Sequence, residues 1–317
     1  MIKILANDGI HPDGKLLLEE ADYQVDTEKI AQENLLTALQ DYDVIIVRSA
    51  TKVRKELIDA CPNLKIIARG GVGMDNIDVE YARSKGIAVI NTPAASSQAV
   101  AELALGHIFT LARSLQVSNR NMTSATFKNL KSSLSGGIQL QGKTLGIVGF
   151  GRIGQAIARM ALGMGFRVLP VDPFIAEAEI KIPIFGQKNI NFSIRLQTEK
   201  LEDVLPKCDF LTVHIPGVDK PVIGKAEIAK MKKTAFIINT ARGGAIDEQA
   251  LLDALNEGRL AGAGLDVFTN EPTPSEALVQ HARISVSPHV GAETQEAQIN
   301  IGTELADQII AFFGDDK

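Results

Sequence analysis

The chain is poor in cysteine and histidine. Its 317 residues include two cysteines and five histidines. Cys61 and Cys208 lie among apolar or strand-edge residues, which suits buried, reduced thiols. We therefore expect a reducing, cytoplasmic location and no disulfide framework. The cysteines and histidines are also scattered without the spacing of metal ligands, so we expect no metal site.

A positive net charge and long apolar runs are also missing. The formal net charge of −5 gives no electrostatic basis for a nucleic-acid or anionic-membrane partner. The apolar residues after Met1 are too few for a signal peptide, and the stretch from Ala99 to Ala112 contains Glu102 and His107. We predict no membrane-spanning or targeting segment. With 45% hydrophobic and 22% charged residues, the composition is that of a globular protein, and the length suffices for two domains.

The strongest motif lies in the segment 144–154. A predicted apolar strand at its start leads directly into the sequence G-x-G-x-x-G, and a predicted helix follows. Gly149 permits a tight turn, Gly151 lets the backbone approach a pyrophosphate, and Gly154 lets the helix pack on the strand. Asp172 ends the next predicted strand, where its carboxylate can accept a ribose 2′-hydroxyl but repels a 2′-phosphate. The alternative is that the three glycines mark nothing more than a tight strand-to-helix connection. The predicted strand, the predicted helix and the acidic residue that follows all favour dinucleotide binding instead. We predict NAD rather than NADP.

Short apolar runs alternate with helical patterns along the chain, which predicts an α/β fold of two Rossmann-like, doubly wound parallel-sheet domains with a cleft between them. The segment 174–197 is less regular and is predicted to be a surface excursion. The last helix, from about Thr294, has one apolar face and is expected to pack back on the N-terminal domain. We therefore expect a discontinuous substrate-binding domain, residues 1–95 and 288–317, and an NAD-binding domain, residues 96–287. The predicted strands are 2–6, 44–47, 64–68, 88–90, 145–148, 167–171, 210–213, 236–239, 262–265 and 284–287.

Charged residues follow several of these strands, at the sheet edge where open parallel sheets bind ligands. Arg242 follows the strand 236–239, where a guanidinium could hold a substrate carboxylate through two parallel hydrogen bonds. His289 follows the last strand, and imidazole is well suited to moving a proton at neutral pH. The carboxylate of Glu271 could hydrogen-bond His289 and favour its protonated form. The alternative for each of the three residues is a purely structural role.

Arg48 and Arg69 end neighbouring predicted strands of the first domain, and the glycine-rich turn 70–73 follows directly. Guanidinium groups beside free backbone N–H groups are typical of an anion site, and two of them suggest a ligand with two anionic groups. The alternative is that both arginines are ordinary solvated strand ends. Three other histidines lack such neighbours and are expected to be structural or surface residues: His11, His107 and His281.

Taken together, these residues resemble the D-isomer-specific 2-hydroxyacid dehydrogenases, and most closely their D-3-phosphoglycerate dehydrogenase branch. The resemblance covers nearly the whole chain. The segments 48–53 and 69–76 favour the phosphoglycerate branch. The other matching segments are Asn91-Thr92-Pro93, Gly149–Gly154, Ala241–Gly244, Asp266-Val267-Phe268, Glu271-Pro272, Pro288-His289 and Gly291-Ala292.

The resemblance implies NAD-dependent oxidation of D-3-phosphoglycerate to 3-phosphohydroxypyruvate, the entry to serine synthesis, by a likewise implied homodimer. Hydride would pass from C2 of the substrate to the nicotinamide while His289 takes the hydroxyl proton. The implied catalytic residues are Arg242, Glu271 and His289, and the implied substrate-binding residues are Arg48, Ser49, Arg69, Val72 and Gly73. The expected cofactor-binding residues are Gly149, Gly151, Arg152, Ile153, Gly154, Asp172, His214, Ile215, Pro216, Thr240, Ala241, Asp266, Gly291 and Ala292.

Two departures from the family pattern bear on this expectation. In the segment 126–137, relatives often carry a tryptophan and a basic cluster that can reach the partner subunit, whereas this chain has Phe127-Lys128-Asn129-Leu130-Lys131 and then serines. No serine-sensing ACT domain follows the last helix, so feedback by that route is not expected. The alternatives are a reductase of glyoxylate, hydroxypyruvate or another 2-oxoacid, and an NAD-sensing, corepressor-like binding protein.

Overall fold

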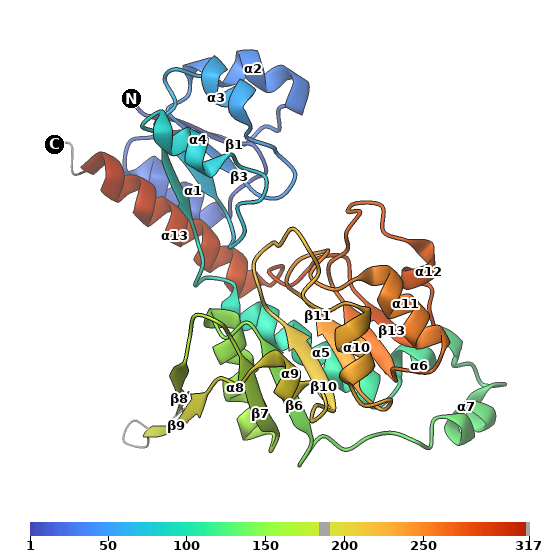
Figure 1. Cartoon of the computed structure of the whole chain (residues 1–317). Helices are drawn as coiled ribbons and strands as arrows, with labels where there is room; N and C mark the ends of the chain where they lie inside the picture. The colour runs from blue at the N-terminus through green and yellow to red at the C-terminus, as the bar shows by residue number, and fades with distance from the viewer. Residues whose placement is uncertain (184–190, 315–317) are drawn as a thin grey trace. The chain divides into compact units, whose positions relative to one another are not determined.

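The computed structural model describes residues 1–183 and 191–314. Clustering of the chain by proximity divides it into two compact units. Unit 1 consists of Met1–Ala99 and Ala292–Lys317, and unit 2 of Val100–Gly291. Each unit is built on a parallel sheet with helices, so the predicted fold of two parallel-sheet α/β domains is confirmed (Figure 1).

The sheet of unit 1 has five parallel strands in the order β2-β1-β3-β4-β5. The sequence predicted all of them except β2, which is three residues long and buries only Val25. Such a short strand shows no alternation to detect. Because the chain turns to opposite sides after β1, the carboxyl ends of β1 and β3 form a topological switch point. The strands are β1 (Lys3–Ala6), β2 (Gln24–Asp26), β3 (Val44–Val47), β4 (Ile66–Arg69) and β5 (Ala88–Asn91).

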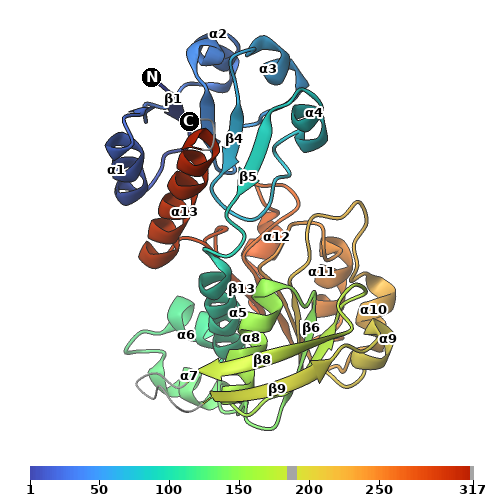
Figure 2. The ribbon, with the colours of Figure 1, turned by 90° about the vertical axis from the view of Figure 1, so that its left-hand side faces the viewer.

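Helix α13 (Gln295–Gly314) packs on this sheet, as the apolar face of the last helix predicted. Its Ile301, Leu305 and Ile309 share a buried cluster with residues of β1, β3 and β4. Helix α13 also lies beside α1 (Figures 1 and 2). A Cβ atom on Gly14 would lie 2.3 Å from the Gly302 carbonyl oxygen, so this close contact depends on glycine. The other helices of the unit are α1 (Pro12–Glu20), α2 (Leu35–Ala38), α3 (Lys55–Ala60) and α4 (Val79–Ser84), with 3-10 turns at Gln32–Asn34 and Leu39–Asp41.

Unit 2 contains a sheet of six parallel strands in the order β13-β12-β11-β10-β6-β7, all at predicted positions. Successive strand residues alternate between two buried clusters: Phe210 faces one and Leu211 the other. The sheet is therefore covered on both faces, and its switch point lies between β6 and β10. The strands are β6 (Thr144–Val148), β7 (Arg167–Val171), β10 (Phe210–Val213), β11 (Phe236–Asn239), β12 (Gly262–Leu265) and β13 (Ile284–Val286).

Helix α11 of unit 2 begins and ends at residue types that favour helix termini. Asp247 caps it by accepting a hydrogen bond from the Ala250 amide (3.0 Å). Gly258 follows with a left-handed φ of 66°. The helices are α5 (Ser97–Ala112, which begins in unit 1), α6 (Leu115–Asn121), α7 (Phe127–Ser133), α8 (Arg152–Gly163), α9 (Leu201–Val204), α10 (Lys225–Lys230), α11 (Glu248–Asn256) and α12 (Glu276–Val279).

The segment 174–197 is more regular than predicted. It forms an antiparallel hairpin of β8 (Glu177–Pro183) and β9 (Asn191–Gln197) that packs beside α8 (Figure 2). Ala178, Ile180 and Leu196 contact the buried cluster of the unit, which explains the order. Polar residues alternate with these apolar ones, so the period of two was the missed signal. The rest of the predicted excursion, residues 184–190, lies outside the described part of the chain.

Both cysteines are free and buried, as expected. Burial raises the pKa of the Cys61 thiol to about 11 and that of Cys208 to about 12, so both stay protonated at neutral pH. Across the described ranges, no helix is long and apolar enough to span a membrane.

Candidate active site

The glycine turn after β6 has the geometry that a bound pyrophosphate requires. Gly149 adopts φ 90°, and a Cβ there would lie 2.3 Å from the His214 carbonyl oxygen. A Cβ on Gly154 would lie 2.1 Å from the Gly149 carbonyl oxygen, so the helix can approach the turn this closely only because residue 154 is a glycine. Gly151, the N-cap of α8, faces no other atom within 4 Å of an added Cβ. The open space and the N–H groups at the start of the helix fit a dinucleotide phosphate.

Asp172, at the end of β7, is fixed by backbone donors. Its Oδ2 accepts from the Phe150 amide (2.8 Å), and its Oδ1 accepts from the amides of Phe174 (2.8 Å) and Ile175 (3.0 Å). These bonds hold the carboxylate against the glycine turn. Each carboxylate oxygen can accept more than one hydrogen bond, so Asp172 can still accept one from a ribose hydroxyl.

Two buried polar atoms at the carboxyl ends of β10 and β11 have no hydrogen-bond partner among the described residues. They are His214 Nδ1 and Thr240 Oγ1. His214 Nε2 contacts Thr212 Oγ1 (2.9 Å), and burial lowers the pKa of His214 to about 3, so its ring is neutral. Buried polar groups are normally paired, so these atoms are suited to a polar ligand at this edge. The predicted Ile215 and Pro216 follow on the same loop.

Arg242 lies on a tightly built turn after β11. The side-chain amide of Asn239 donates to the Arg242 carbonyl (2.8 Å), and Asn239 Oδ1 accepts from the Ala241 amide (3.1 Å). The Arg242 guanidinium donates to the Ala241 carbonyl (2.6 Å). A Cβ on Gly243 would lie 2.1 Å from the Phe268 carbonyl oxygen, so this turn packs directly on the loop that carries Glu271.

His289 and Glu271 form the predicted hydrogen bond, with 2.7 Å between Nδ1 and Oε2. Burial alone would raise the pKa of the Glu271 carboxyl. The hydrogen bonds from His289 and the Phe268 amide, with the charges of His289 and Arg242, outweigh burial and lower it. Since an ionised carboxylate can only accept, Nδ1 carries a proton, and Nε2 of a neutral ring can accept one. His289 itself adopts a left-handed φ of 54°.

Asp266 holds the backbone on which His289 lies. Its backbone carbonyl accepts from the His289 amide (2.8 Å), and its carboxylate accepts from the amides of Val290 (2.9 Å) and Gly291 (3.0 Å). The hydroxyl of Ser287 donates to Oδ1 (2.6 Å). Asp266 is 1% exposed, so these four bonds replace its hydration.

His107 extends this network into the core, which the sequence did not reveal. Its Nδ1 contacts Ser285 Oγ (2.8 Å) and its Nε2 contacts Ser287 Oγ (3.0 Å). Because Ser287 gives its proton to Asp266, it must accept from Nε2–H, which leaves Nδ1 to accept from Ser285. Burial lowers the pKa of His107, consistent with this neutral tautomer. His107 is thus a structural residue, as expected, but one connected to the His289 loop.

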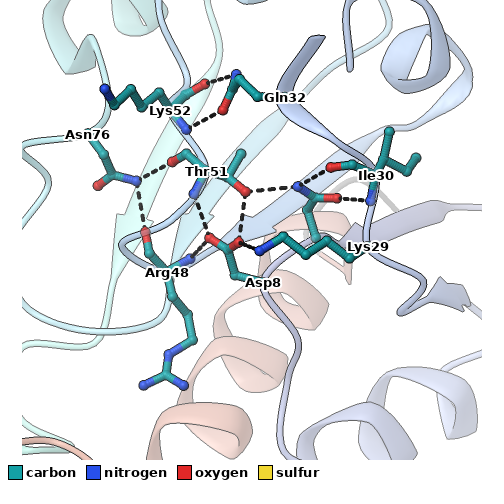
Figure 3. A network of polar contacts seen from close by, with 9 residues as sticks. Asp8, Lys29, Ile30, Gln32, Arg48, Thr51, Lys52 and Asn76 are labelled. Carbon is teal, nitrogen blue, oxygen red and sulfur yellow. Dashed lines mark hydrogen bonds and ion pairs between the residues drawn. The ribbon is translucent and has the colours of Figure 1, made fainter. Parts of the chain in front are cut away.

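In unit 1, a polar network fixes the loop that carries Arg48 at the switch point (Figure 3). The Asp8 carboxylate accepts from the amides of Arg48 (2.8 Å) and Thr51 (3.0 Å) and from the Thr51 hydroxyl (2.8 Å). Asn76 donates to the carbonyls of Arg48 (2.8 Å) and Thr51 (2.6 Å). The Arg48 guanidinium points away from this network and pairs with Glu293. Asp8, Asn76 and Glu293 were not singled out from the sequence.

Arg69 ends β4, where its neighbour in β3 is Val47. It therefore lies one residue out of step with Arg48, at the same sheet edge. Gly71, next along the turn, adopts φ 140°, and its amide donates to the buried Thr92 hydroxyl (2.9 Å). The Val72 carbonyl accepts from the Asn91 side chain (2.8 Å). Unit 1 thus contains the predicted substrate residues Arg48, Ser49, Arg69, Val72 and Gly73, whereas unit 2 contains Arg242, Glu271, His289 and all predicted cofactor residues except Ala292.

A glycine turn at the switch point of a doubly wound sheet, with an aspartate fixed beside it, defines a dinucleotide-binding α/β protein. Within this class of protein, the chain matches sequence models of the D-isomer-specific 2-hydroxyacid dehydrogenase family. Its NAD-binding domain matches residues 105–291, and its catalytic domain matches residues 4–147. The chain belongs to this family.

Individual relatives point to more than one substrate. The chain is 40% identical to D-3-phosphoglycerate dehydrogenase of Methanocaldococcus jannaschii over 98% of its own length, but spans 57% of that protein. It is 39% identical to hydroxypyruvate reductase of Thermotoga maritima, covering 95% of this chain and 94% of the relative. A structure of NAD⁺-bound 3-phosphoglycerate dehydrogenase from Entamoeba histolytica superposes with a TM-score of 0.78 at 30% identity, covering 100% of this chain and 96% of the other.

Proposed function

We propose that the protein is an NAD-dependent dehydrogenase that oxidises D-3-phosphoglycerate to 3-phosphohydroxypyruvate. The observation that carries this proposal is the His289–Glu271 hydrogen bond at 2.7 Å, on the sheet that also carries the glycine turn and Arg242. It gives a proton acceptor of defined orientation within the NAD-binding unit. The phosphorylated substrate is supported by the two arginines of unit 1 and by the similarity to phosphoglycerate dehydrogenases.

In this mechanism, each group of the chain has a separate task. NAD, when bound, supplies the hydride acceptor. Arg242 binds the substrate carboxylate and orients C2, and the neutral Nε2 of His289 takes the C2 hydroxyl proton as the carbonyl forms. Glu271, whose pKa lies below the ordinary 4.5 and which is therefore ionised at neutral pH, stabilises the imidazolium that results. In unit 1, Arg48, Arg69 and the amides of Val72 and Gly73 bind the remaining anionic group.

The chain's own residues favour NAD over NADP. The Asp172 carboxylate lies against the glycine turn and would repel a 2′-phosphate, while no arginine follows it in residues 173–175. We further propose that the enzyme acts in the cytoplasm, as a homodimer, in serine synthesis.

The second candidate is reduction of hydroxypyruvate or glyoxylate. Two observations favour it: the hydroxypyruvate reductase relative is matched over 94% of its length, and Glu293 already pairs with Arg48. An unphosphorylated oxoacid needs fewer cations than a phosphorylated one. A purely NAD-sensing protein would have no use for the arginines of unit 1.

A substrate panel tests the proposal. NADH formation or consumption is measured with 3-phosphoglycerate, D-glycerate, hydroxypyruvate and glyoxylate, each with NAD(H) and NADP(H). We expect the highest kcat/KM for the phosphorylated pair with NAD(H). The double variant Arg48→Ala, Arg69→Ala should lower this value at least about 100-fold, and that for D-glycerate much less, because charge-assisted bonds contribute about 1.5–3 kcal/mol each. No preference for the phosphorylated acid would exclude the proposed substrate, and no turnover at all would favour a binding role.

A further inference from the structure

Glu293 lies where it can compete with a ligand for Arg48. It directly precedes Thr294, whose hydroxyl accepts from the Ala297 amide (3.1 Å) and caps α13. Its carboxylate pairs with the Arg48 guanidinium, and both residues belong to unit 1. A carboxylate on an arginine occupies the same N–H donors that a bound substrate anion would use.

Arg48 does not need Glu293 to hold its position. Its amide donates to Asp8 and its carbonyl accepts from Asn76, so the loop is fixed through the backbone (Figure 3). The side chains of Arg48 and Glu293 are 30% and 40% exposed. An ion pair this exposed contributes about 0–1 kcal/mol to stability, and an incoming dianion can displace it.

Space for a small anion is available beside Arg48. A cavity of about 270 Å³ opens there, within unit 1, and Asp8, Gln298 and Ile301 also line it. The Asp8 carboxylate in this lining is already occupied by its backbone donors. The cavity wall thus offers an anion the Arg48 guanidinium, whose present partner is Glu293.

We propose that Glu293 is a specificity-determining residue, an internal anion that must leave Arg48 before a phosphorylated substrate can bind. This inference rests on the proposed function for its substrate class. A phosphate dianion that contacts Arg48 loses part of its binding free energy to the displaced carboxylate, and it is also repelled by it. An unphosphorylated hydroxy acid, held through its single carboxylate, avoids this competition. Glu293 thus narrows the preference of the enzyme for phosphorylated over unphosphorylated acids.

The test is calorimetric titration of the full chain, saturated with NADH so that no turnover occurs. The ligands are 3-phosphoglycerate, D-glycerate and inorganic phosphate. Glu293→Gln should tighten binding of 3-phosphoglycerate about tenfold and of inorganic phosphate severalfold, and that of D-glycerate less than about twofold. Glu296→Gln is the matched control, because it removes the same charge three residues further on at an exposed position. It should change no affinity by more than about twofold.

Two results would overturn the inference. One is an unchanged affinity of Glu293→Gln for both phosphate-bearing ligands. The other is a gain that is just as large in the Arg48→Ala background, measured as Glu293→Gln, Arg48→Ala against Arg48→Ala. These titrations do not depend on catalysis. If the wild type fails to oxidise 3-phosphoglycerate while Glu293→Gln binds it more tightly through Arg48, the proposed function fails and the inference stands.

Discussion

The two units fix their ligand loops by the same device, an aspartate that accepts backbone N–H groups. In unit 1, Asp8 holds the Arg48 loop, and in unit 2, Asp266 holds the His289 loop. The surroundings of the two aspartates differ. Asp266 is 1% exposed, and its hydrogen bonds extend through Ser287 to the buried His107. Asp8 instead contacts the exposed Lys29 at 3.8 Å.

This difference separates a fixed set of candidate residues in unit 2 from an exchangeable set in unit 1. The unit 2 network ends on a His–Glu pair that needs a single geometry to move a proton. The unit 1 network ends on an arginine whose guanidinium extends beyond it to a partner that solvent reaches. We infer that the chemistry depends on unit 2 and that substrate choice depends on unit 1.

The largest effect should come from the end of the unit 2 network. His289→Gln removes the proton acceptor but keeps a polar side chain of similar size. We expect kcat to fall about 100- to 10,000-fold, the range for loss of a general base, with little change in NADH affinity. Steady-state kinetics and NADH fluorescence titration measure both. If kcat stays within tenfold of the wild type, His289 does not accept the proton.

A matched pair of variants compares the two anchors directly. Asp266→Asn must turn its N–H₂ group toward a backbone donor, because each carboxylate oxygen of Asp266 accepts from a backbone amide. Leaving a buried donor unpaired costs about 1–3 kcal/mol, so this variant should lower the free energy of unfolding by about 2 kcal/mol in urea denaturation. Asp8→Asn should lower it by less, because its remaining oxygen can accept from the amides of both Arg48 and Thr51 while the N–H₂ group faces the Thr51 hydroxyl.

Their functional effects should differ. Asp266→Asn should lower kcat and weaken NADH binding, because its donors belong to the His289 loop. Asp8→Asn should raise KM for the phosphorylated substrate and leave NADH binding unchanged. Weakened NADH binding in Asp8→Asn would show that the two loops do not divide the function in this way.

The sequence predicts those elements of the fold that show a clear local pattern of apolar residues. All four residues of β10 are buried and three of them are apolar, the fourth being Thr212, and the prediction for this strand matches its observed bounds. The residues after each strand could be found because parallel strands end at one edge. The hairpin of β8 and β9 was missed although Ile180 and Leu196 fit a period of two, since no partner sheet is evident for them.

Residues whose role depends on a partner far away in the chain could not be predicted from the sequence. Asp8 bonds the Arg48 amide 40 positions away, and Glu293 pairs with Arg48 across 245 positions. A single acid after a strand or before a helix is too common to single out. His107 was predicted to be structural, but its connection to Asp266 depends on Gly264, where a Cβ would lie 2.7 Å from the His107 Cβ.

The smallest expected effect is a dependence of the free energy of unfolding on pH, which we expect from Glu271 in unit 2. The pKa of Glu271 is lowered from its ordinary value of 4.5 in the folded chain, so between the lowered value and 4.5 the unfolded chain binds more protons. The contribution of Glu271 to stability is therefore complete above about pH 4.5 and is lost as the pH falls through the lowered value. Glu271→Gln should be less stable than the wild type at pH 7, and this difference should disappear in acid.

The side chain of Glu271 is 35% exposed, so solvent screening should keep its contribution below about 1 kcal/mol. Urea denaturation of both proteins from pH 7 down to the lowest pH at which both fold measures it. A difference for Glu271→Gln that stays constant into acid would mean that the ionised carboxylate does not stabilise the His289 loop.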